Sequence, residues 1–169
     1  MMPSASSDDC SSLWNFSLDY YARPGVADAC LQLQDGHGVN VNLLLWCVWL
    51  ERRGLVLDKV RLRKAQKRIH AWDEHYVIPL RHLRRRMKVE FGSADAGIEA
   101  LRSQIKQAEL LAEKQLQIWL EAEVQTWSDG AADSASPPVA GDNLRLYLLQ
   151  LNVTEAAIAR LLQLFASVV

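Results

Sequence analysis

The stretch NVNLLLWCVWLERRG, residues 40–54, decides how the rest of the chain is interpreted. Between positions 41 and 50 it contains one polar side chain, Asn42, and charged residues then end the apolar run. A helix that crosses a bilayer needs about 20 apolar residues, whereas about 10 to 14 indicate a buried helix. If residues 41–50 form a helix, their apolar side chains surround it instead of forming one stripe, which is typical of a central helix. We therefore expect a central buried helix, capped by Asn40 or Asn42 and ended by Gly54, and no membrane span.

Length, composition and cysteine content indicate an ordinary helical protein of the cytoplasm. The chain has 169 residues, half of them hydrophobic, so we expect one domain with a sizeable core. Its net charge of -1 argues neither for nor against a polyanionic partner. The N-terminus lacks the basic and apolar regions of a signal peptide. The cysteines Cys10, Cys30 and Cys47 are odd in number and form no CxxC pair, which favours a reducing compartment.

Periodicity predicts helices throughout, including two long ones. Apolar residues recur every three or four positions from Leu62 to Met87, and Pro79 interrupts this pattern. Gly92 marks a reversal, after which a second long helix is expected over about 94–127. The sequence therefore predicts an all-α, single-domain helical bundle. It would have a compact N-terminal helical cluster, a long, Pro-kinked antiparallel helical hairpin, and a short C-terminal helical pair.

Changes in composition suggest how the chain is divided. Residues 128–142 are small, polar and proline-bearing, as is typical of a linker. We expect a disordered tail over 1–11, a helical core domain over 12–127, a flexible linker or loop over 128–142, and a C-terminal helical pair over 143–169 that packs on the core.

Charge is distributed unevenly along the chain. From Glu51 to Glu90 there are 13 lysines and arginines against 5 acidic residues, a net charge of +8, and the remainder carries -9. Clusters of this kind bind nucleic-acid phosphates or acidic protein surfaces. The candidate basic face comprises Arg81, Arg84, Arg85, Arg86 and Lys88. The alternative is that this helix lies beside acidic side chains of the next one, namely Glu99, Glu109, Glu113, Glu121 and Glu123.

The loop QDGHGVNVN, residues 34–42, combines an acid, an imidazole, amides and glycines at a helix junction. Helix N-termini present unpaired amides that suit anions, although turn and capping chemistry explains each residue by itself. The loop matches neither a calcium loop nor a phosphate loop. A candidate small-molecule site between this loop and the Pro79 kink would use Arg81 and the following residues: Asp35, His37, Asn42, Trp46 and His75.

No catalytic or metal-binding constellation can be assigned. His70 and Glu74 share a helical face, but zinc would require further ligands. No GxSxG, HExxH or Cys-His pattern is present. We therefore assign no catalytic residue, metal or cofactor, and a binding protein is favoured over an enzyme.

Two segments resemble a known family. LQD at 33–35 with VNLLLW at 41–46, and WDEHYVIPLRHLRRRMK at 72–88, match an LQD…G…VNLLL(W/F) signature and a W…PLR.LRR.(L/M)K helix. The chain is similar, over most of residues 13–125, to a family of small uncharacterised bacterial proteins that form a domain of unknown function. The resemblance implies a cytosolic helical protein and no particular reaction.

Three hypotheses about function follow. The leading one is a non-enzymatic binding or adaptor protein whose basic face meets an acidic protein or nucleic acid. The second is a small-molecule-binding protein or enzyme with its site near the 34–42 loop. The third is a homo-oligomer joined through an aromatic surface.

Overall fold

The central helix forms where the apolar run predicts it. In α3 (Val41–Arg52), every residue from Asn42 to Leu50 is buried. The Asn40 side chain caps it by accepting hydrogen bonds from the N–H groups of Asn42 and Leu43, which would otherwise lack partners at a helix start. The predictions of a central buried helix and of its Asn40 cap are confirmed.

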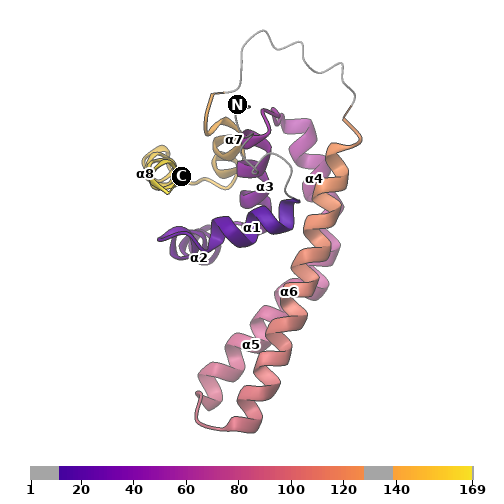
Figure 1. The fold of residues 1–169 in the computed structure, drawn as a ribbon, viewed down its shortest axis with the longest axis vertical. Helices are drawn as coiled ribbons and strands as arrows, with labels where there is room; N and C mark the ends of the chain where they lie inside the picture. The colour runs from indigo at the N-terminus through magenta and orange to yellow at the C-terminus, as the bar shows by residue number, and fades with distance from the viewer. Residues whose placement is uncertain (1–11, 128–138, 169) are drawn as a thin grey trace, which may run out of the picture.

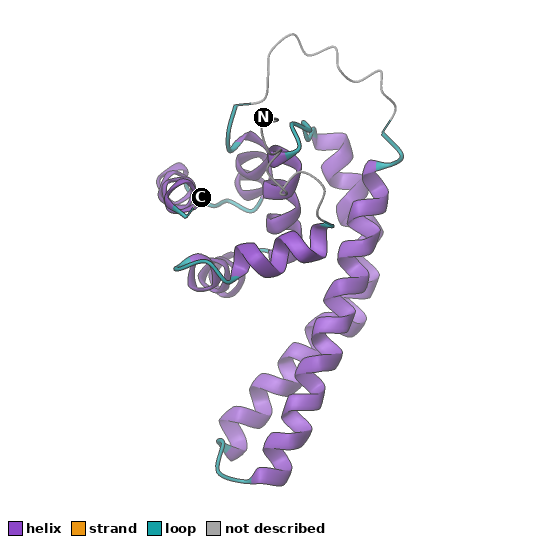
Figure 2. Ribbon diagram, in the orientation of Figure 1, coloured by secondary structure: helices purple, strands orange, loops and turns teal. Residues whose placement is uncertain are grey.

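The computed structural model describes residues 12–127 and 139–168, and helices dominate this part of the chain (Figures 1 and 2). Besides α3, the elements in chain order are α1 (Leu13–Tyr21), α2 (Val26–His37), α4 (Lys59–Trp72), the π-helical turn η2 (Asp73–Val77), α5 (Ile78–Phe91), α6 (Ala96–Val124), α7 (Asp142–Gln150) and α8 (Glu155–Ser167). No strand occurs within these ranges, so the all-α prediction is confirmed. The tail predicted for 1–11 and most of the linker predicted for 128–142 lie outside the described residues. None of the described helices is both long and apolar enough to cross a bilayer.

The long hairpin extends away from the other helices. α4, η2 and α5 follow one another along α6, and the far end of α5 and α6 protrudes beyond the cluster formed by α1, α2 and α3 (Figure 1). Gly92, with a φ of +66°, ends α5, and the Asp95 side chain caps α6. Trp72 joins the two arms, because its indole N–H donates to the carbonyl of Ala112 at 2.9 Å. The predicted antiparallel hairpin is therefore present.

The interruption predicted at Pro79 takes the form of a π-helical turn. The N–H of Ile78 donates to the carbonyl of Asp73, five residues earlier, instead of to the residue four positions back. Pro79 consequently falls in the first turn of α5, where a missing N–H is tolerated. The sequence placed the irregularity at Pro79, and the structure begins it at Asp73.

Polar side chains join α7 to α3. The Glu51 carboxylate accepts from the N–H groups of Gly141 and Leu144 at 3.0 and 3.1 Å, which places a negative charge at the start of α7. The Asn143 side chain accepts from the N–H of Leu57 and donates to the carbonyl of Leu55, both at 2.8 Å. We call this contact region the α3–α7 joint. α8, capped by Thr154, packs against α2 and α7.

Candidate functional site

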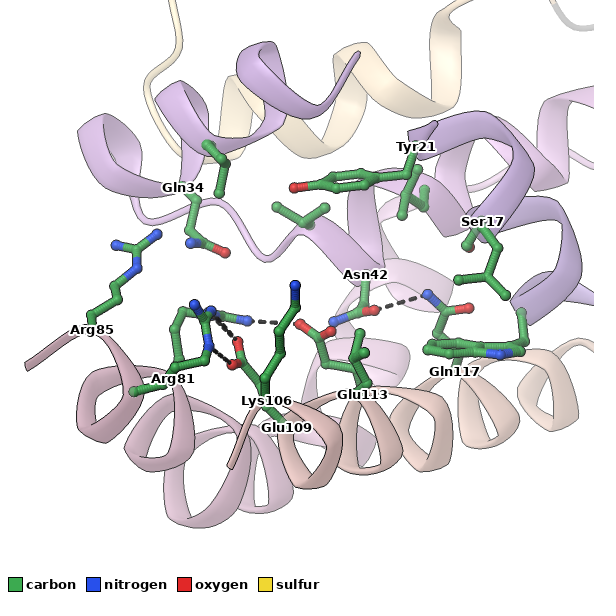
Figure 3. A pocket seen from close by; sticks show the side chains of 17 residues that line it. Ser17, Tyr21, Gln34, Asn42, Arg81, Arg85, Lys106, Glu109, Glu113 and Gln117 are labelled. Atoms are coloured by element: carbon green, nitrogen blue, oxygen red, sulfur yellow. Dashed lines mark hydrogen bonds and ion pairs between the residues drawn. The ribbon is translucent and has the colours of Figure 1, made fainter. Parts of the chain in front are cut away.

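A pocket lies where α1, α2 and α3 meet the α5–α6 hairpin (Figure 3). Its volume is about 470 Å³, within the range of about 300–1,000 Å³ that is usual for small-molecule sites. Much of its wall is apolar, including Leu45 and Leu110. Leu18 and Leu31, also in the wall, are 50% and 38% exposed, which is high for large apolar side chains in a concave site. The pocket therefore presents apolar surface that the described residues leave uncovered.

A cluster of ion pairs from both arms of the hairpin forms one side of the pocket. The buried Glu109 carboxylate accepts from Arg81 Nε at 3.1 Å and from Arg84 Nε at 2.6 Å. A second nitrogen of Arg81 donates to Glu113 at 2.8 Å. Figure 3 shows Glu109 and Glu113 projecting from α6 toward Arg81 of α5. Because each arginine is held by a carboxylate, the positions of these charges are fixed before any ligand arrives.

The Glu113 carboxyl is electrostatically unusual. Burial raises its pKa above the ordinary value of 4.5, whereas Arg81 lowers it and the neighbouring Glu109 raises it further. The Asn42 amide also lies beside it and favours the charged form. The net effect is that Glu113 holds its proton more strongly than a carboxyl group in water.

A buried polar wall continues from this cluster toward α1. Gln117 is 1% exposed, and its amide nitrogen donates to Asn42 Oδ1 at 2.8 Å (Figure 3). Its carbonyl oxygen has no hydrogen-bond partner among the described residues, and neither has the hydroxyl of Ser17, which is 4% exposed. Buried polar atoms almost always have partners, so two unpartnered ones at the same pocket require an explanation.

Two cations lie at the rim. Arg85 pairs with Asp35 of α2 at 2.9 Å, and both side chains are largely exposed, at 41% and 58%. This bond is the main reason that the pKa of Asp35 lies below its ordinary value. Lys106 is exposed, makes no ion pair with any residue of the described ranges, and points from α6 into the space between the hairpin and α1–α2 (Figure 3). The lining thus contains four cations and two carboxylates, a net charge of +2.

The pocket lies in a part of the chain that matches a known family. A family described as "Protein of unknown function (DUF2390)" matches residues 12–120. The chain belongs to this family. Comparisons with the curated proteins and with the solved structures gave no significant match. The predicted resemblance is confirmed, and the pocket lining, from Trp14 to Gln117, lies entirely inside the DUF2390 match.

The predicted basic face of the DUF2390 chain is divided between two environments. Arg81 and Arg84 turn toward the acidic side chains of α6 and line the pocket, as the alternative of internal neutralisation proposed. Arg85 lies at the rim. Arg86 and Lys88 are exposed near the end of the hairpin, and Arg86 approaches Glu90 at 3.8 Å.

The residues predicted for a small-molecule site are also divided. Asn42 lines the pocket, and Asp35 reaches its rim through Arg85. Trp46 is completely buried in the core, where its ring meets that of Trp127 with centroids 6.0 Å apart. His37 lines a separate hollow beside α8, and His75 is exposed on η2. The structure therefore brings Asn42, Arg81 and Asp35 to the pocket and leaves the other three elsewhere.

Sequence reasoning did not assign Ser17, Lys106, Glu109, Glu113 or Gln117 to a ligand site. A signal existed for α6, because Lys106, Glu109, Glu113 and Gln117 recur at intervals of three and four and so form one polar stripe. Nothing in the sequence distinguishes Ser17 from a helix residue facing solvent.

Metal and thiol chemistry find little support in the described residues. No group of three or more His, Cys, Asp or Glu side chains there could hold a metal ion. Cys30 and Cys47 are buried and free, and burial raises the pKa of Cys30 to about 12 and that of Cys47 still further. Neither thiol is a reactive nucleophile near neutral pH.

Proposed function

We propose that this protein binds a small molecule in the pocket between α1–α3 and the hairpin. The observation that carries the proposal is a pair of oxygens, on Ser17 and Gln117, that are buried beside the same pocket and have no hydrogen-bond partner among the residues the structure describes. Each such atom costs about 1–3 kcal/mol when it is left unsatisfied. A ligand with a hydrogen-bond donor would supply the missing partner.

The rest of the lining supports the same function. Small-molecule sites combine a mostly apolar wall with a few fixed polar groups. Here leucines of α1, α2 and α3 form the apolar part, while Asn42 and the Arg81 cluster supply positioned polar atoms. Because their mutual bonds already order these side chains, binding would cost little side-chain entropy.

The test uses two fluorescent probes, uncharged N-phenyl-1-naphthylamine and its sulfonated analogue 1-anilinonaphthalene-8-sulfonate. We expect saturable binding of at least one probe with one site per chain. Leu110→Trp, which fills the pocket, should weaken that binding at least tenfold. Leu111→Trp is the matched control, because Leu111 is the next residue of α6 and is 68% exposed outside the lining.

Circular dichroism and denaturation would first establish that both variants fold. Saturable binding that Leu110→Trp does not weaken would overturn the proposal, and so would failure of both probes to bind the wild type.

A second candidate function, partner binding through a basic surface, is favoured by a different observation. Lys59, Arg63 and Lys67 are exposed at intervals of four on α4, and none forms an ion pair within the described part of the chain. Together with Arg86 and Lys88 they could meet an acidic protein or nucleic acid.

This second function is tested on the exposed cations. Reversing Arg81 or Arg84 would break the internal cluster, so those residues cannot test a surface. The triple variant K59E/R63E/K67E should elute from immobilised heparin at clearly lower salt than the wild type. Equal elution would remove the support for this function.

A further inference from the structure

We infer that the ligand of this pocket is a small amphipathic anion, with its acidic group held by Arg85 and Lys106 and its apolar body against the leucines of the wall. This inference rests on the proposed function, since it specifies the chemical class of the molecule bound there. Its basis is the way in which the charges of the lining are paired.

The inner arginines are already occupied. Glu109 accepts from both Arg81 and Arg84, and Glu113 accepts from Arg81, so these four charges balance one another. What remains of the lining's positive charge belongs to Arg85 and Lys106. A neutral or cationic ligand would leave Lys106 without an opposite charge among the described residues and Arg85 with only the exposed Asp35, whereas one acidic group would satisfy both cations.

Asp35 shows how such an acid could bind. Its carboxylate accepts from Arg85 at 2.9 Å, although Asp35 itself does not line the pocket. An ion pair between side chains this exposed is worth only about 0–1 kcal/mol, so a competing acid can replace Asp35 at little cost. Lys106 supplies a second cation that Asp35 does not engage. A ligand acid that reaches both cations would therefore displace Asp35 from Arg85.

The apolar part of the ligand follows from the opposite wall. Leu18 and Leu31 are exposed at the pocket, and Leu45 and Leu110 continue the surface inward. Covering apolar area contributes about 25 cal/mol per Å², so a bare inorganic anion would leave this surface unused. A chain or ring system attached to the acid would cover it.

The pair of probes defined above separates charge from shape, because they share one ring skeleton and differ in the sulfonate. We expect the wild type to bind 1-anilinonaphthalene-8-sulfonate at least tenfold more tightly than N-phenyl-1-naphthylamine. Lys106→Met should weaken binding of the sulfonate several-fold and leave the neutral probe unchanged. Lys67→Met, an exposed cation outside the lining, controls for the loss of one positive charge.

Asp35→Asn gives the sharpest test, because it should strengthen binding. Removal of the competing carboxylate should raise the affinity for the sulfonate several-fold without changing that for the neutral probe. Asp28→Asn, an exposed acid on the same helix, controls for net charge and should have little effect.

The outcomes distinguish the two proposals. Equal affinities for both probes, each lost in Leu110→Trp, would leave pocket binding intact and overturn the anionic class. An Asp35→Asn variant that binds the sulfonate no better than Asp28→Asn would overturn the competition between Asp35 and the ligand. Binding that Leu110→Trp does not weaken would overturn both proposals.

Discussion

Two buried amides, one near each end of α3, have contrasting surroundings. Asn143, in the α3–α7 joint, uses both ends of its side chain, to Leu57 N–H and to the carbonyl of Leu55. Within the described part of the chain, Gln117, at the pocket, has a partner for its nitrogen alone, which donates to Asn42. Both residues are 1% exposed, so burial does not explain the difference. The comparison suggests that the first amide holds the fold together and that the second keeps an acceptor available for a ligand.

The largest expected effect is on the α3–α7 joint. Asn143→Leu keeps the branching at Cγ but leaves the N–H of Leu57 and the carbonyl of Leu55 without partners. We expect the free energy of unfolding to fall by about 3 kcal/mol, because two buried backbone groups lose their hydrogen bonds. Urea denaturation would measure this. A loss below about 1 kcal/mol would mean that the joint does not depend on this side chain.

A second substitution, also at the α3–α7 joint, tests the start of α7. Gly141 has a φ of +92°, and a Cβ there would lie 2.7 Å from a methyl group of Leu162. Gly141→Ala should therefore destabilise the protein by about 2 kcal/mol through backbone strain and crowding. Gly38→Ala is the control, because Gly38 also has a positive φ, of +66°, but has open space around it. Its cost should be about 1 kcal/mol, and equal costs would exclude a contribution from Leu162.

On the pocket side, the pH dependence of stability tests the environment of Glu113. The raised pKa of Glu113 means that the folded protein keeps a proton that the unfolded chain loses near pH 4.5. This contribution to stability is complete below pH 4.5 and is lost as the pH rises through the folded-state pKa. Relative to Glu113→Gln, the wild type should therefore lose stability over that interval in denaturation experiments at stepped pH.

Glu99, in the first turn of α6, provides a control of opposite sign. Its bond with Arg102 lowers its pKa, so its contribution is present above pH 4.5 and disappears as the pH falls through the lowered value. Relative to Glu99→Gln, the wild type should gain stability as the pH rises. Slopes of the same sign for the two variants would contradict the assigned environment of Glu113.

The smallest effect is expected at Gln117. Gln117→Met removes the hydrogen bond to Asn42 but also removes an unpartnered buried oxygen. These changes oppose each other, so the free energy of unfolding should change by less than about 1 kcal/mol. A loss as large as that of Asn143→Leu would show that Gln117 is structural and would weaken the contrast between the two amides.

Local patterns in the sequence predicted much of the fold. The apolar run before Glu51 identified α3 and its Asn40 cap, and the period of three and four from Leu62 identified the hairpin. Thr154 and Asp58 are residue types that favour helix N-caps, and both side chains accept hydrogen bonds from the first turn of the following helix. These features depend on neighbours within a few residues, which is why one sequence suffices to find them.

The candidate site was much less predictable, because it depends on contacts between distant segments. The bond from Arg85 to Asp35 spans 50 residues, and that from Gln117 to Asn42 spans 75. Composition indicated that the arginines near 81–86 could pair with the glutamates of the next helix, but not which of them would do so. The unpartnered oxygens of Ser17 and Gln117 result from packing alone and have no counterpart in a sequence pattern.

The π-helical turn at Asp73–Val77 sets the directions in which the side chains of α5 point. Such a turn takes up one residue more than an α-helical turn, and each residue of a helix advances its side chain by about 100°. Removing one residue from this turn should restore α-helical pairing and swing Arg81 and Arg84 by about that angle around the axis of α5. They would then point away from Glu109, so the cluster beside the pocket depends on a single inserted residue located about two turns before it.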